Sequence, residues 1–208
     1  MRMNGKGQIK MTFESEIKTS SIPLWNRLPE ARKFVILEAK YIDIQGTMAT
    51  YTNPYDASSK PIPVTIEALF DGNQYQSDHV IPINYVKNLQ NLHGFSWGIE
   101  KMLAFYYDLD AQVLIPKDMN APKGSKGLLK YCPPFGPITG ASDLRTRYQN
   151  ASLAEKIVVE NYCFTWKHIA SKWQIYGYLD PSTKNIIKEM LEKAKIARRS
   201  PQLINPHY

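Results

Sequence analysis

Cysteine is scarce in this chain, whose 208 residues include only Cys132 and Cys163. The two thiols lie far apart in the sequence, and neither belongs to a Cys-x-x-Cys or Cys-x-His pattern. Secreted proteins of this size commonly carry more cysteines, arranged as disulfide pairs. We therefore expect two buried free thiols in a protein of a reducing compartment.

Long apolar runs are missing as well. No uninterrupted run approaches the roughly 18 residues that a membrane-spanning helix needs, and the longest, at 34–37 and 113–116, are the length of strands. Residues 1–10 lack the apolar core of a secretory signal peptide. We expect an intracellular protein of the cytoplasm, an organelle matrix or a virus-type particle, with no transmembrane segment and no signal-directed secretion.

Common catalytic signatures are also absent from the sequence. No Ser–His–Asp or Cys–His set can be assembled. The run Lys123-Gly124-Ser125-Lys126-Gly127 lacks the strand and helix that frame a Walker phosphate loop. Its backbone amides and two cations are typical of a loop that touches a polyanion. We expect no bound cofactor.

Positive charge is present in excess, with a formal net charge of +7, and it is concentrated at the two ends. Residues 1–10 carry +3 and residues 184–208 carry +4, which leaves residues 11–183 with no net charge. Such arms are typical of proteins that contact nucleic acid, an acidic protein surface or lipid headgroups, and solubilising tails are the alternative. The residues expected to contact a polyanion are Arg2, Lys6, Lys10, Lys123, Lys126, Arg145, Arg147, Lys184, Lys188, Lys195, Arg198 and Arg199.

The first half of the chain has the alternation and the β-branched content of strands. Residues 8–85 predict a mostly antiparallel β unit. The dipeptide Asp71-Gly72 is a favourable hairpin turn and predicts that the strands on its two sides pair with each other. The expected strands cover residues 8–18, 33–44, 63–70 and 74–83, and residues 47–52 are a candidate fifth strand that continues the sheet after Gly46.

The second half has helical periodicity. A helix is expected within 95–109, then a strand at 111–116, and the proline and glycine content of 116–143 predicts a long irregular segment. An amphipathic helix is expected over 152–178, and Asp180-Pro181 is a good start for a second helix. The apolar stripe of the first of these two helices consists of Val158, Tyr162, Trp166, Ile169, Trp173 and Tyr176.

These elements predict an α+β protein in which a mostly antiparallel β unit precedes a long Pro/Gly-rich loop and a C-terminal helical pair. Its expected parts are a basic arm (1–10), a single α+β domain (11–180), and a basic C-terminal helix and tail (181–208). The domain would contain the β unit (8–85), a helix and irregular segment (95–150) and the amphipathic helix (152–178).

One short motif points to catalysis. The run Gln76-Ser77-Asp78-His79-Val80-Ile81-Pro82 is followed by Asn88-Leu89-Gln90-Asn91-Leu92-His93. The first run resembles the Asp-His-hydrophobic-hydrophobic-Pro opening of HNH-type nucleases. In that family the motif ends a strand, an Asn follows in the loop, and a helix supplies a last His or Asn.

The resemblance implies three roles. Asp78 would hold a divalent metal beside the scissile phosphate, His79 would accept a proton from water as the general base, and Asn91 would be the orienting residue. The last ligand is then expected on the helix after Trp97, where the sequence has Glu100 and Lys101.

The basic ends and the Pro/Gly segment indicate an assembly role instead. We expect a non-catalytic structural or accessory subunit of a larger assembly, whose basic arms contact nucleic acid or an acidic protein or membrane surface. Its expected partners are other protein subunits, and RNA or DNA is a candidate for the anionic partner. The alternative is an HNH-like metal-dependent nuclease built around Asp78 and His79, with a divalent metal as its only cofactor.

Overall fold

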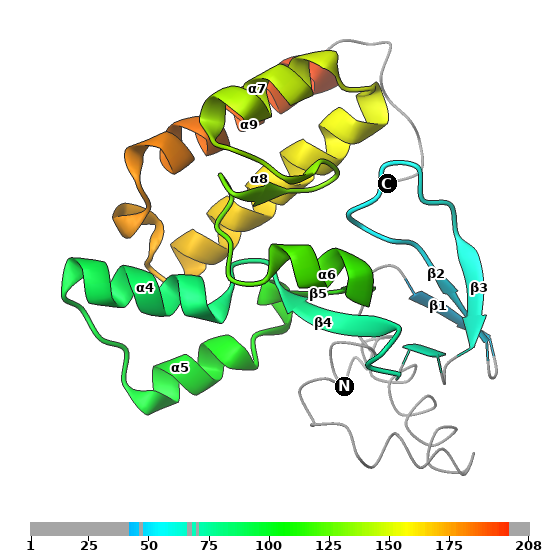
Figure 1. Cartoon of the computed structure of the whole chain (residues 1–208), viewed down its shortest axis with the longest axis horizontal. Helices are drawn as coiled ribbons and strands as arrows, with labels where there is room; N and C mark the ends of the chain where they lie inside the picture. Colours follow the sequence, from blue (N-terminus) through cyan, green and yellow to red (C-terminus); the bar gives the residue numbers. More distant parts are fainter. Residues whose placement is uncertain (1–41, 46–47, 66–67, 70, 200–208) are drawn as a thin grey trace, which may run out of the picture.

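The structure is a computed structural model that describes residues 42–45, 48–65, 68–69 and 71–199. Several expected features lie outside these residues: the basic arm with Arg2, Lys6 and Lys10, the strand at 8–18, most of the strand at 33–44, and the tail at 200–208. The described part mixes helices with small antiparallel sheets, which confirms the predicted mixture of helix and strand (Figure 1).

The first sheet is antiparallel, with its strands in sequence order: β1 (Ile42–Gln45), β2 (Met48–Tyr51) and β3 (Ile62–Thr65). Side chains alternate along a strand, so Ala49 and Tyr51 of β2 both point into the interior. The Tyr51 hydroxyl donates a hydrogen bond to the carbonyl oxygen of Leu114 at 3.0 Å, which ties this sheet to the next one.

The second sheet pairs β4 (Tyr75–His79) with β5 (Gln112–Pro116), in an antiparallel register that places Asp78 opposite Val113. The hairpin predicted at Asp71-Gly72 is wrong, because residues 68–69 are helical and β4 pairs with a strand from beyond the next two helices. The burial of β5 explains why β4 pairs with it, since Leu114 and Ile115 of β5 are almost fully enclosed. The strand predicted at 111–116 is confirmed.

Two α-helices and a short 3-10 helix (Leu109–Ala111) separate β4 from β5. The first is α4 (Ile83–His93), which begins after Pro82 and ends at Gly94 in a left-handed conformation. The second is α5 (Ile99–Tyr106), a shorter helix than the one expected within 95–109. Helix α4 was not predicted, although its apolar Ile83, Val86 and Leu89 repeat every three residues.

Residues 116–143 are not irregular, contrary to the prediction. They contain α6 (Lys117–Lys123), which starts directly after β5, and a short hairpin made of β6 (Tyr131–Cys132) and β7 (Gly136–Pro137). Pro116 precedes α6, where its missing N–H costs no helical hydrogen bond. Pro122 lies inside α6, Pro133 and Pro134 form the turn after β6, and Pro137 belongs to β7, so the prolines do not mark a structureless loop.

The C-terminal helices are α7 (Ala141–Asn150), α8 (Leu153–Lys172) and α9 (Pro181–Arg199). The middle of the predicted apolar stripe is confirmed, since Tyr162, Trp166 and Ile169 of α8 are buried. Val158 is half-buried, and Trp173 and Tyr176 lie beyond the end of the helix. This helix ends before residue 178, because Gln174 has a positive φ and a 3-10 turn (Tyr176–Tyr178) follows.

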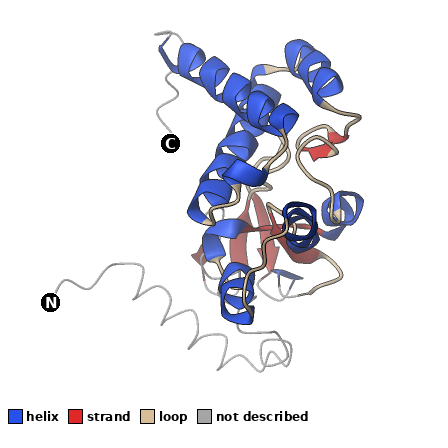
Figure 2. Cartoon of the chain, turned by 90° about the vertical axis from the view of Figure 1, so that its left-hand side faces the viewer, coloured by secondary structure: helices blue, strands red, loops and turns tan. Residues whose placement is uncertain are grey.

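The predicted start of α9 is confirmed as well. The backbone N–H of Thr183 donates to Asp180 Oδ1 at 2.9 Å, so Asp180 caps the helix. The long helices lie on one side of the molecule and most of the strands on the other (Figure 2). A shared core of buried apolar side chains extends from Val80 after β4 to Met190 on α9.

The remaining expectations about class can be compared with the described residues. None of the described helices has both the length and the apolar character needed to span a membrane. Cys132 and Cys163 are free and buried, as predicted. Burial raises the pKa of both thiols.

Candidate functional site

A buried ion pair joins α6 to the end of β4. Lys123, the last residue of α6, donates from Nζ to Asp78 Oδ1 at 2.7 Å. The two side chains are 0% and 5% exposed. The helix packs against β4 and β5, which follows from its starting directly after β5. Lysine and aspartate are rarely enclosed to this degree unless they are paired.

Both carboxylate oxygens of Asp78 have a partner. The Tyr55 hydroxyl donates to Oδ2 at 3.2 Å, and the backbone N–H of Tyr55 is in turn held by Asn53 Oδ1 at 3.0 Å. The Lys123 ammonium also donates to the backbone carbonyl oxygen of His79. The cluster therefore connects the loop after β2, the end of β4 and the end of α6.

Burial dominates the electrostatics of this cluster. It raises the pKa of the Asp78 carboxyl, and the adjacent Lys123 ammonium opposes that shift. It lowers the pKa of Lys123, and Asp78 opposes that shift. Burial and the Asp78 charge together raise the pKa of Tyr55. Each charge has lost its water, so removing one partner would leave the other buried and uncompensated.

Asn120 belongs to the same contact between helix and strand. It lies three residues before Lys123, and residues at this spacing share one face of a helix. Its Nδ2 donates to Gln76 Oε1 at 2.9 Å, and Gln76 shares the face of β4 with Asp78. The face of α6 that carries Asn120 and Lys123 therefore covers the face of β4 that carries Gln76 and Asp78.

His79 follows Asp78 and contacts α5. Its Nε2 lies 3.0 Å from the carbonyl oxygen of Tyr106, and its ring centroid lies 5.8 Å from that of Phe105. A carbonyl can only accept, so Nε2 carries the proton of the neutral ring and Nδ1 is left as the acceptor. Burial lowers the pKa of His79, which favours the neutral form.

The donor types at this site fit a hard divalent cation such as Mg²⁺. Such an ion is commonly held by one or two protein carboxylates, with waters and substrate phosphates in its other positions. Asp78 supplies a carboxylate, and the amide of Asn120, whose Nδ2 donates to Gln76, has Oδ1 as its candidate ligand atom. Over residues 42–199, as far as the structure describes them, no group of three His, Cys, Asp or Glu side chains could hold a metal. The ion would therefore depend on Asp78 and Asn120.

Two expectations about individual residues need correction here. Lys123 was expected to contact a polyanion, but its ammonium is buried against Asp78 and does not reach the surface. The last ligand was expected on the helix after Trp97. That helix is α5, whereas α6 is the helix that carries an amide, from Asn120, to the β4 face. The physical reason is connectivity, since α6 follows the partner strand of β4 without a linker.

Asn91, the expected orienting residue, is exposed on α4. Glu100 is also exposed, while Lys101 lies with its Nζ 4.9 Å from the centroid of the Trp97 ring. The structure gives Asn91 no contact with Asp78 or His79 among the hydrogen bonds of the described residues. The amide of Asn120 is the one that meets the β4 face.

The expected basic contacts on α7 are paired with carboxylates. Arg145 Nε lies 2.7 Å from Glu189 Oε2, and Arg147 Nε lies 2.8 Å from Asp143 Oδ1. Both arginine side chains are partly exposed. These two arginines therefore contribute less positive surface than their sequence positions indicate.

The basic residues of α9 that were expected to contact a polyanion differ in their partners and exposure. Lys195 Nζ lies 2.9 Å from Glu192 Oε1, and Lys184 Nζ donates to the Gly177 carbonyl oxygen at 2.6 Å. Lys188 is exposed. Arg198 and Arg199 end the helix, and their side chains lie outside the described residues.

A basic surface surrounds α6 itself. Lys117 at its start and Lys126 and Lys130 after its end are all exposed, and Asp118 is the exposed acidic residue among them. Lys126 thus keeps the surface position predicted for it, with its ammonium hydrogen-bonded to the Pro122 carbonyl oxygen. These lysines lie on the same segment as the buried Lys123.

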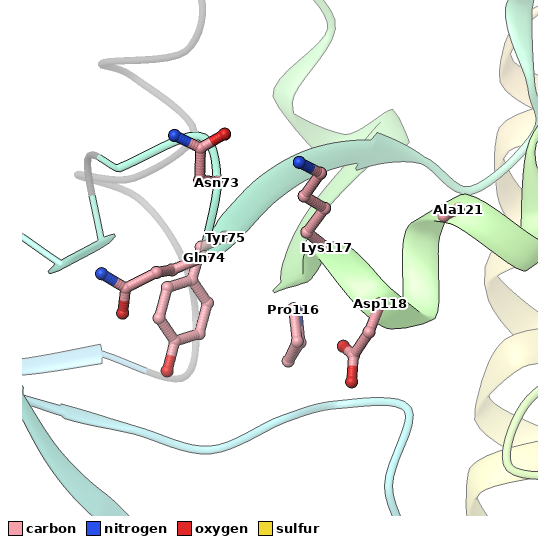
Figure 3. Close-up of a pocket in the computed structure, with 7 residues that line it drawn as sticks. All are labelled: Asn73, Gln74, Tyr75, Pro116, Lys117, Asp118 and Ala121. Carbon is pink, nitrogen blue, oxygen red and sulfur yellow. The ribbon is translucent and has the colours of Figure 1, made fainter.

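An open hollow lies at the other end of the β4–β5 pair (Figure 3). It is bounded by residues 73–75 at the start of β4 and by residues 116–118 and Ala121 at the junction of β5 and α6. Lys117 and Asp118 are its charged residues, and their charges cancel. It contains neither Asp78 nor His79, so it is separate from the ion-pair site.

The sequence analysis missed Tyr55 and Asn120. Asn120 and Lys123 are three residues apart, which would place them on one face of a helix. The helix itself was not predicted, because the prolines around these residues indicated an irregular segment. Tyr55 lies in a turn-rich segment whose sequence gives no sign of contact with β4.

Comparison with known proteins adds no further assignment, because no family model, no curated protein and no solved structure matches the chain. Function therefore has to be inferred from the chain's own residues and their geometry.

Proposed function

We propose that this chain is an HNH-like metal-dependent nuclease that hydrolyses phosphodiester bonds in nucleic acid. One observation carries the proposal. Strands β4 and β5 pair antiparallel, α6 follows β5 directly, and the helix lies on the strands with Asn120 and Lys123 against Gln76 and Asp78. The Asp-His motif therefore ends a strand, and a neighbouring helix supplies an Asn, which are two of the three features that the HNH resemblance implies. The third, an Asn in the following loop, is not met, because α4 begins directly after Pro82 and Asn91 is exposed on that helix.

The proposed roles follow from the atoms that each residue presents. Asp78 and Asn120 would hold a divalent cation, which when bound supplies Lewis-acid stabilisation of the scissile phosphate. The Nε2–H of His79 is held by the Tyr106 carbonyl, so Nδ1 is the atom that can take a proton from water. Exposed Lys126 and Lys130, which follow Lys123 in the sequence, would add positive charge that attracts phosphates, whereas Lys117 lies at the opposite end of α6.

The test is metal-dependent cleavage of plasmid DNA and of single-stranded DNA and RNA by the purified full chain. We expect cleavage with Mg²⁺ or Mn²⁺ that is abolished by EDTA. His79→Ala should lower the rate by roughly 10²–10⁴-fold, the usual contribution of a general base, and Asn120→Ala should raise the metal concentration needed.

Matched controls are available on α8. His168→Ala and Asn161→Ala replace exposed residues of the same types and should cleave at the wild-type rate. Thermal unfolding of every variant checks that the fold is intact. The proposal loses if the wild-type chain cleaves none of the three substrates with Mg²⁺, Mn²⁺, Ni²⁺ or Zn²⁺, or if the folded His79→Ala variant cleaves as fast as the wild type.

A second candidate function is the assembly subunit expected from the sequence, and one observation favours it. Helix α5 buries Phe105 on one face and exposes Ile99, Leu103 and Tyr106 on the other, to 80%, 48% and 43%. These three residues have helical spacing and form an apolar stripe, which is typical of surfaces that bind another protein. Lys188 of α9 would add an exposed positive charge for an anionic neighbour.

Light scattering after size-exclusion chromatography, first of native extract and then of the purified chain, tests this second candidate. An assembly subunit should elute as part of a larger particle, and Ile99→Ser with Leu103→Ser should release it, as should removal of residues 1–10 or 195–208. Leu153→Ser, which alters an exposed leucine of α8, should not. A wild-type chain that is monomeric in extract refutes the assembly role.

A further inference from the structure

We propose that Lys123 is an internal cation that competes with the divalent metal for Asp78, so that metal binds only as the Lys123 ammonium leaves the carboxylate. The inference rests on the proposed function, because it concerns regulation of the same site. The proposed role of Lys123 is regulatory. It differs from the contact with a polyanion that was expected from the sequence, and the Asp-His motif does not include this lysine.

The contacts of the ammonium carry the argument. Lys123 is fully enclosed, and its Nζ reaches Asp78 Oδ1 at 2.7 Å and the His79 carbonyl oxygen. The other carboxylate oxygen is engaged by Tyr55. A metal bound to Asp78 would take a position about 2 Å from a carboxylate oxygen, within the space that the ammonium now shares.

Electrostatic repulsion also prevents the Lys123 ammonium and a divalent metal from binding Asp78 at the same time. A monovalent and a divalent cation on one carboxylate repel each other, and that repulsion is strong where water is excluded. Asp78 offers a single negative charge at the site. The carboxylate therefore stabilises either the ammonium or the metal.

The end of α6 provides a way for the lysine to leave. Lys123 is the last helical residue, and Gly124 follows it with φ +49, a conformation that favours glycine. Residues 124–126 are exposed. The proposed outward movement would take the Lys123 side chain from the buried end of α6 toward this exposed segment.

Manganese binding to four forms of the full chain tests the competition: the wild type, Lys123→Met, Asp78→Asn, and the double variant. Calorimetry should show that Lys123→Met binds Mn²⁺ tighter by roughly tenfold to a thousandfold, the range that one nearby charge imposes on the affinity of a carboxylate for a proton. Mn²⁺ should also raise the melting temperature of Lys123→Met more than that of the wild type. Both effects should vanish in the double variant.

A second measurement does not depend on any variant folding. Acetic anhydride labelling of the wild-type chain, read by peptide mass spectrometry, should leave Lys123 unmodified without metal and acetylate it at saturating Mn²⁺. Lys167, which is exposed on α8, should react equally in both conditions.

The outcomes separate this inference from the proposed function. If Asp78→Asn binds Mn²⁺ as well as the wild type, the metal is not at Asp78, and both fail. If binding and cleavage need Asp78, yet Lys123→Met binds no tighter, or Lys123 stays protected at saturating Mn²⁺, the competition alone is refuted.

Discussion

Gly127 offers a sharp test of how the segment after α6 is held. A Cβ atom at this position would lie within van der Waals overlap of the Tyr85 ring, 3.0 Å from its Cδ2 and closer still to its Cε2. Tyr85 is half-buried, and its ring meets the fully buried Trp166 edge-on at 5.4 Å, so it cannot move toward the core. Gly127→Ala should therefore force the ring or the backbone to shift.

The cost can be sized from that overlap. Inserting one methyl group into a well-packed interior typically destabilises a protein by about 1–3 kcal/mol. For a chain of this size each kcal/mol corresponds to roughly 2–4 °C in melting temperature. Gly127→Ala should thus melt about 2 to 12 °C below the wild type, in calorimetry or in circular dichroism at fixed scan rate.

A double-mutant cycle with Tyr85→Leu identifies the cause. If the methyl group collides with the ring, the free-energy cost of Gly127→Ala should shrink when Tyr85 is already replaced by leucine, so the two changes will not be additive. Gly177→Ala is the control, since a Cβ at this exposed position meets no atom within 4 Å. The reasoning is refuted if Gly127→Ala leaves the melting temperature unchanged, or if its cost is the same with and without the Tyr85→Leu substitution.

Three further outcomes follow from the structure. Asp180→Ala removes the oxygens that bind Thr183 at the start of α9 and should cost about 1 kcal/mol in urea unfolding, whereas Asp180→Ser should keep most of the cap; equal stability of all three proteins would show that the cap contributes nothing. Changing Lys117, Lys126 and Lys130 to Gln should make the slope of log K against log salt for duplex DNA shallower by roughly 0.9 for each phosphate that the variant no longer neutralises, measured by fluorescence anisotropy. Lys167→Gln should leave that slope unchanged, and an unchanged slope in the triple variant would place the nucleic acid elsewhere. Cys132 and Cys163 should resist Ellman's reagent at pH 8 until the chain unfolds, because burial raises the pKa of both thiols; fast labelling of the folded chain would contradict their burial.

The helices with strong local signals could be predicted from the sequence. The stripe on α8 repeats every three or four residues, and Asp180-Pro181 supplies both a cap and a first-turn proline for α9. Each signal lies within one element and needs no partner to be recognised. The structure confirms the start of α9 and the helix over 153–172, on which Tyr162, Trp166 and Ile169 are buried.

The pairing of β4 could not be predicted in the same way. Asp71-Gly72 gave a local reason to form a hairpin, whereas the competing reason, burial of Leu114 and Ile115 beside β4, depends on residues beyond two helices. Local turn preference is weak compared with the burial of a whole strand face. The candidate site was missed in part for the same reason, since α6 reaches Asp78 only after β5 is paired.

The net charge of a long segment does not show where its charged residues cluster, and here it did not reveal the basic surface around α6. Residues 11–183 have no net charge, yet residues 117–130 contain four lysines and one aspartate. Of these lysines, Lys123 is buried and paired with Asp78. The other three, Lys117, Lys126 and Lys130, are exposed, as is Asp118. The segment after β5 thus places one cation at the buried carboxylate and three at the surface, so the positive charge relevant to a phosphate substrate lies around α6 as well as at the ends of the chain.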